Sequence, residues 1–242
     1  MSRIAHTAKG NLTTVGDNSS AIFSLINGTG AGGITINNSG DISTRGIGSG
    51  GISSTSLALG GSVITNTGNI NSLNGYGIFG SSARGISSIT NSGNIRAATT
   101  GLFNASSNLT VTEDIRSIVR NDGDIFAGTG IFSSATGGRN VVINSGAITA
   151  ARNNGYGIFA SNSSGDVSVF NNNAIAGSGD GFSGIFAVAT NGNVSVTNSA
   201  DIVVTGLNSQ GIFAAASTGQ IRIDSTGNIL GGAERNRVKP VS

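Results

Sequence analysis

The chain has 242 residues, of which 40 are glycine and 10% are charged, and its formal net charge is +2. No cysteine occurs, which excludes a disulfide framework. The basic residues are scattered, with no cluster before Arg235, Arg237 and Lys239, so nucleic acid is not expected as a partner. The first ten residues lack an apolar leader and no run of 18 apolar residues occurs, so we predict no transmembrane segment.

Taken in chain order, the sequence divides into three parts. Residues 1–20 carry no repeat signature, and we expect them to form an N-terminal cap or a degenerate coil. Residues 21–230 alternate a Gly-Ile-Phe tripeptide with an Asn-Ser-Gly-x-Ile pentad, roughly every 27 residues. Residues 231–242 hold the only proline, Pro240, and are predicted to be a polar C-terminal tail or a truncated linker.

The repeat has two aliphatic landmarks besides the Gly-Ile-Phe strand. The pentads end at Ile42, Ile70, Ile95, Ile125, Ile148, Ile175, Ile202 and Ile229. Six residues before each of them stands a β-branched residue, namely Ile36, Ile64, Ile89, Val119, Val142, Val169, Val196 or Ile223. Good helix formers are scarce and no helical stripe persists across repeats, so these segments are predicted to be strands.

These features predict an all-β fold, a single-stranded parallel β-helix of about eight coils with three short strands per coil. We expect the solenoid to be right-handed and to form a rod roughly 40 Å long, since stacked coils rise about 4.8 Å each. Two residues before each pentad isoleucine glycine predominates, with Asn173 and Ala200 as exceptions. This pattern predicts a turn with positive φ, and it predicts that Ala200→Gly is stabilising.

An asparagine recurs four residues before the pentad isoleucine. The row comprises Asn38, Asn66, Asn91, Asn121, Asn144, Asn171 and Asn198. Side-chain amides repeated in this way can bond from coil to coil, so we predict a structural asparagine ladder, with a glycan-contacting row as the alternative.

A phenylalanine recurs directly after the inward aliphatic residue of the Gly-Ile-Phe strand. The phenylalanine column comprises Phe79, Phe103, Phe132, Phe159, Phe186 and Phe213. It can form an outward interaction stripe or a buried or half-buried stack of rings, and both alternatives stay open.

Catalytic chemistry has little support in the sequence. His6 is the only histidine, which argues against a histidine-based triad or zinc site, and no catalytic residue, metal or cofactor is predicted. Asp41, Asp124 and Asp201 share one corner position but lie three coils apart, which is roughly 14 Å between neighbours. The longest repeat, 95–125, carries an insertion, and its charged residues are the candidates for ligand contact or for a surface salt-bridge loop: Glu113, Asp114, Arg116 and Arg120.

Asn-Ser-Gly-Asn-Ile and Asn-Asp-Gly-Asp-Ile alternating with Gly-x-Gly-Ile-Phe-Ala-Ser resemble the adhesin-like passenger β-helix of bacterial autotransporters over about residues 21–230. The resemblance implies export and display at the bacterial cell surface, or an extracellular location. It predicts a non-enzymatic adhesin stalk or interaction scaffold whose partner is a host or matrix surface or a glycan. The alternatives are a fibre subunit that stacks end to end with like subunits, and a β-helix that binds or cleaves polysaccharide.

Overall fold

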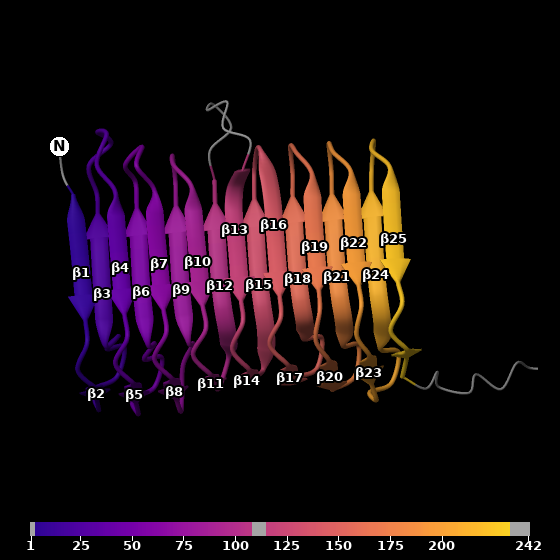
Figure 1. Ribbon diagram of the computed structural model, residues 1–242, viewed down its shortest axis with the longest axis horizontal. Helices are drawn as coiled ribbons and strands as arrows, with labels where there is room; N and C mark the ends of the chain where they lie inside the picture. Colours follow the sequence, from indigo (N-terminus) through magenta and orange to yellow (C-terminus); the bar gives the residue numbers. More distant parts are fainter. Residues whose placement is uncertain (1–2, 108–114, 233–242) are drawn as a thin grey trace, which may run out of the picture.

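The computed structural model describes residues 3–107 and 115–232, and the regular structure in these residues is entirely β-strand. The strands form three parallel sheets around one axis, and Figure 1 shows the resulting rod, indigo at its N-terminal end and yellow at its C-terminal end. The predicted parallel β-solenoid of about eight coils is confirmed.

Successive strands of the chain go to sheets A, B and C in turn, so each coil crosses all three. Within the described residues, sheet A contains β1 (Ile4–Ala8), β4 (Ile34–Asn38), β7 (Ser62–Asn66), β10 (Ser87–Asn91), β13 (Ile115–Asn121), β16 (Arg139–Asn144), β19 (Val167–Asn171), β22 (Val194–Asn198) and β25 (Ile221–Ser225). Sheet B contains β2 (Leu12–Thr14), β5 (Ile42–Thr44), β8 (Ile70–Ser72), β11 (Ile95–Ala97), β14 (Ile125–Ala127), β17 (Ile148–Ala151), β20 (Ile175–Ser178), β23 (Ile202–Val204) and β26 (Ile229–Leu230). Sheet C contains β3 (Ile22–Ile26), β6 (Ile52–Ser56), β9 (Ile78–Ser82), β12 (Thr100–Ser106), β15 (Thr129–Ala135), β18 (Tyr156–Asn162), β21 (Ser183–Ala189) and β24 (Gln210–Ala216).

The core consists of aliphatic columns that stack in register from coil to coil. The pentad isoleucines are direct partners in sheet B, as in Ile42 with Ile70. Sheets A and C add columns that include Ile36 and Ile78, and both of these side chains are fully buried. Burying an isoleucine contributes about 1.5–3 kcal/mol, whereas ordering one residue costs about 1–2 kcal/mol of backbone entropy. A coil is therefore stable only against its neighbours.

The pentad glycines do not have the left-handed conformation that the sequence predicted. None of them is among the described residues with positive φ, which are Asn18, Asn154, Asn208, Gly48, Gly61, Gly138, Gly179 and Gly181. The prediction was wrong because close backbone packing, not φ, excludes a side chain here. A Cβ at Gly40 would overlap the carbonyl oxygen of Gly10, and a Cβ at Gly93 would overlap that of Gly68.

The same finding removes the basis for expecting Ala200→Gly to relieve left-handed strain. Ala200 also lacks positive φ. Its carbonyl oxygen is the atom that a Cβ at Gly227 would meet. The position two residues before the pentad isoleucine therefore forms a line of close backbone contacts from turn to turn along the rod.

The stack of strands begins ahead of the repeat signature. β1 pairs in register with β4, and β2 pairs with β5. His6 takes the position that Ile36 has in the next strand of sheet A. In the last described coil, aliphatic residues whose equivalents are buried in the preceding coils are nearly half exposed, as at Ile221 (47%) and Ile229 (45%). The tail residues 233–242 lie outside the described part of the chain.

Candidate functional site

The asparagine ladder is a buried row of side-chain amides where sheet A turns toward sheet B. The Nδ2 of each asparagine from Asn38 to Asn171 donates to the Oδ1 of the asparagine in the next coil, at 2.7–2.9 Å. The same nitrogen donates to the backbone carbonyl two residues later, as Asn121 does to Gly123 at 2.7 Å. All seven side chains are at most 2% exposed, so the ladder connects coils and is out of reach of an external glycan.

The two ends of this ladder differ. Asn38 Oδ1 accepts no hydrogen bond, because the paired position in β1 is Ala8. At the other end, Asn198 Nδ2 donates to Ser225 Oγ at 3.0 Å. The continuous amide row therefore runs from the second coil to the eighth.

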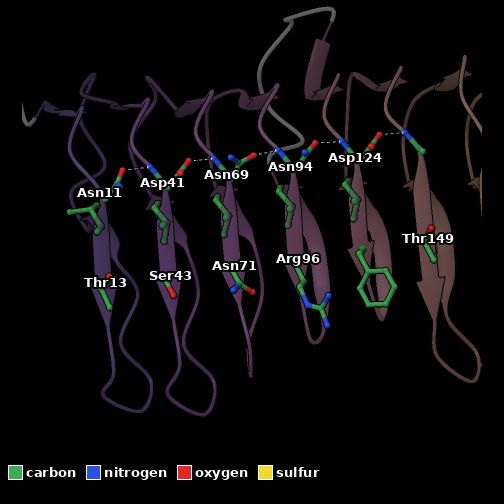
Figure 2. A pocket seen from close by; sticks show the side chains of 17 residues that line it. Asn11, Thr13, Asp41, Ser43, Asn69, Asn71, Asn94, Arg96, Asp124 and Thr149 are labelled. Carbon is green, nitrogen blue, oxygen red and sulfur yellow. Dashed lines mark hydrogen bonds between the residues drawn. The ribbon is translucent and has the colours of Figure 1, made fainter.

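A second row, the corner column, lies at the start of the sheet B strands and is exposed. Its first five members are Asn11, Asp41, Asn69, Asn94 and Asp124. One side-chain oxygen of each accepts a hydrogen bond from the backbone N–H of the next coil at 2.8–3.0 Å, as the dashed lines in Figure 2 show. The second carboxylate oxygen of each aspartate and the amide nitrogen of each asparagine remain at the surface.

The corner column is interrupted at Ala147 and Ala174, which carry no side-chain acceptor. Here the backbone N–H of Ala174 donates instead to Oδ1 of Asn173, at 2.8 Å. Asn173 Nδ2 in turn donates to the carbonyl of Ser145 at 2.9 Å. Asn173 replaces glycine at this position and supplies the acceptor that Ala147 lacks.

Beside the corner column, the outward residues of sheet B complete a groove of about 670 Å³. They are Thr13, Ser43, Asn71, Arg96, Phe126 and Thr149, each directly after an inward aliphatic residue, and Figure 2 shows several of them in a line across the strands. The Arg96 guanidinium lies 5.1 Å from the centroid of the Phe126 ring, a cation–π contact. The groove thus follows the rod axis over six coils, or about 24 Å from first to last at the usual strand spacing.

The groove offers many hydrogen-bonding side chains, but its two carboxylates lie far apart. Two carboxyl groups acting on a glycosidic bond need to lie about 5–9.5 Å apart. Asp41 and Asp124 stand three coils apart, which is about 14 Å. Among residues 3–107 and 115–232 there is also no cluster of three side chains suited to holding a metal ion.

The phenylalanine column lies on the outer face of sheet C. Ile78 is buried while Phe79 is half-buried, and this alternation repeats in the following strands. Consecutive rings stack at centroid distances of 4.4–5.5 Å with interplanar angles of 2–13°. The column is thus a half-buried stack of rings on the outer face of the sheet, with the outward orientation of one alternative and the stacking of the other.

Arg116 and Arg120, two of the four charged residues predicted for ligand contact, do not line the groove. Glu113 and Asp114 lie outside the described residues. Arg116 is fully buried at an irregularity in the pairing of β13 with β16, where its Nη1 donates to the carbonyl of Arg84 at 3.4 Å. Arg120 is exposed on the outer face of sheet A. The groove lies on sheet B, whereas Arg116 and Arg120 belong to β13 of sheet A.

The sequence did carry a signal for the groove. Its outward residues are the positions directly after each pentad isoleucine, where Ser43, Asn71, Arg96 and Phe126 follow one another. This position has no consensus residue, so the repeat pattern does not single it out.

No protein-family model, curated protein or solved structure matches this chain. In the described part of the chain, no helix has the length and apolar character needed to span a membrane.

Proposed function

We propose that the chain is a non-enzymatic interaction scaffold, displayed on a bacterial surface or secreted, that binds an extended neutral glycan along the groove of sheet B. The observation that carries this proposal is the corner column beside the outward row Thr13 to Thr149. Together they offer hydrogen-bonding groups at one spacing over six coils. A straight row of this kind fits a polymer better than a compact ligand.

The side chains of the groove favour a glycan over the other extended polymers. A nucleic acid needs several basic residues, and the groove has Arg96 as its only basic residue against Asp41 and Asp124. A peptide added as a strand needs an open sheet edge, whereas β5, β8, β11 and β14 at the floor of the groove are paired on both sides. Sugar hydroxyls both donate and accept, which matches the mixture of amides, hydroxyls and carboxylates.

Arg96 and Phe126 are the residues on which binding is expected to depend most. Phe126 is 49% exposed and provides the one aromatic surface of the groove. Hydrogen bonds to a charged group are worth about 1.5–3 kcal/mol, so loss of Arg96 is expected to weaken binding by about tenfold or more.

Affinity electrophoresis in gels that contain xylan, amylose or chitin oligosaccharides tests the proposal. Arg96→Ala and Phe126→Ala should abolish the retardation seen with the unmodified chain. Arg120→Ala and Phe170→Ala are matched controls, because both side chains are exposed on the outer face of sheet A. Equal retardation of all four variants would place binding elsewhere, and the appearance of new reducing ends would show that the chain is an enzyme.

A further inference from the structure

A second pocket, of about 450 Å³, lies on the sheet C side of the rod, away from the groove. Its lining includes Phe103 of β12, Phe132 of β15 and the turn that joins β17 to β18. The phenylalanine column therefore provides part of this pocket, and the other part comes from polar side chains.

The two phenylalanine rings present their edges to the pocket. Phe103 and Phe132 stack at 4.9 Å with an interplanar angle of 2°, so each covers the face of the other. The edge of an aromatic ring carries partial positive charge, in contrast to its face. An anionic group is therefore better accommodated against this surface than a cation.

The ring of Tyr156 also lines the pocket, but it is tilted relative to the stacked phenylalanine rings. Its ring is tilted by 60° from both Phe159 and Phe186, at centroid distances of 5.0 and 5.4 Å. Tyr156 therefore contacts both of these rings and also lines the pocket. An apolar ring face beside a hydroxyl suits a sugar, which has both kinds of surface.

Arg152 brings a positive charge to the pocket, and no Asp or Glu lines it. The side chain is exposed and has no ion-pair partner within residues 3–107 and 115–232. Its turn is well anchored: Gly155 N donates to the carbonyl of Arg152 at 3.0 Å, and Asn154 N donates to the carbonyl of Asp180 in the next coil at 2.8 Å. The guanidinium is thus carried by a turn that is tied to its neighbour.

We propose that this pocket binds an acidic sugar residue, a pyranose that carries a carboxylate. Arg152 pairs with the carboxylate, since a guanidinium and a carboxylate form two parallel charge-assisted hydrogen bonds. The hydroxyls of Thr100, Thr129 and Tyr156 bond to sugar hydroxyls, and the ring of Tyr156 packs against the sugar ring. This site is separate from the groove of sheet B and does not depend on the function proposed for it.

Isothermal titration calorimetry with three probes tests this assignment: methyl β-D-glucuronide, the neutral methyl β-D-glucoside and inorganic phosphate. The glucuronide should bind at least tenfold more tightly than either of the other two. Arg152→Gln should remove this preference, and Thr129→Val should weaken glucuronide binding severalfold. Arg45→Gln, which removes an exposed arginine from a turn at another site, should leave the titration unchanged.

Three results would overturn the assignment. Equal binding of phosphate would indicate a general anion site, equal binding of the glucoside would exclude a role for the charge, and no binding of any probe would exclude the site. Arg96→Ala, which is designed to disable the groove, should leave glucuronide binding intact. Circular dichroism of Arg152→Gln checks that its loss of binding does not reflect unfolding.

Discussion

The asparagine ladder and the corner column lie three residues apart in the same turns, yet they differ in burial and in the residue types they contain. The ladder is buried and consists of asparagine alone from Asn38 to Asn198. The corner column is exposed and contains asparagine, aspartate and, at Ala147, alanine. A ladder position such as Asn121 donates two hydrogen bonds and accepts one, which an amide can do and a hydroxyl with its single hydrogen cannot. A corner position only accepts, and water can replace it. Burial therefore decides how strictly one residue type is kept from coil to coil.

The largest effect is expected when a carboxylate enters the buried row. In Asn121→Asp the new side chain faces two acceptors, the carbonyl of Gly123 and Oδ1 of Asn144, with no hydrogen to donate when ionised. Burial raises its folded-state pKa above the unfolded value of about 3.9. The variant should therefore be least stable at neutral pH and regain stability as the pH falls toward 4.

Urea unfolding at pH 7 and pH 4 measures this effect, and the unmodified chain provides the reference. We expect a loss of several kcal/mol at pH 7, since burying a charge without a partner is strongly unfavourable. A variant whose deficit relative to the reference is the same at both pH values would show that position 121 is open to water.

Removal of the same side chain gives the next largest effect. Asn121→Ala leaves Asn91 Nδ2, Asn144 Oδ1 and the carbonyl of Gly123 each short of one hydrogen bond. An unpaired buried polar group costs about 1–3 kcal/mol, so the total loss should be about 3 kcal/mol or more. Thermal or urea unfolding checks this value, and a loss below about 1 kcal/mol would contradict the ladder's structural importance.

A double-mutant cycle tests whether Asn173 compensates for the acceptor that Ala147 lacks. Asn173→Gly restores the common glycine but removes the acceptor for Ala174 N–H, so it should cost about 1 kcal/mol. Ala147→Asn restores the missing corner acceptor, and in that background Asn173→Gly should be close to neutral. The free energies of unfolding of the four proteins give the coupling, and additive effects would refute the compensation.

The smallest effect is expected at the exposed row. Asp124→Asn keeps an oxygen that can accept from Ala147 N–H, now at 2.9 Å, and should change the free energy of unfolding by less than about 0.5 kcal/mol. Measured in the same urea titration, this substitution is the matched counterpart of Asn121→Asp. A large loss here would abolish the distinction between the two rows.

The sequence was sufficient to predict the coils because Ile42, Ile70 and their equivalents recur at a spacing that only stacked strands explain. It could not separate two reasons for a glycine such as Gly40, because positive φ and a close carbonyl both exclude a Cβ. For Phe103 and Phe132 it gave stacking as one of two alternatives and could not decide between them, because the repeat alone does not determine how the rings are oriented. Arg96 and Phe126, which line the groove, could not be singled out because their position in the repeat has no consensus residue.

The asparagine ladder also has an electrical consequence. Each inter-coil amide bond has its N–H directed toward the C-terminal end of the rod and its acceptor oxygen toward the N-terminal end. Aligned amide dipoles add along their common axis, as peptide dipoles do in a helix, and bonded amides polarise one another. The ladder therefore has a dipole of its own, with its negative end at Asn38, where the unpartnered Oδ1 lies, and its positive end at Asn198. The two ends of the ladder thus differ in sign although every side chain in it is uncharged.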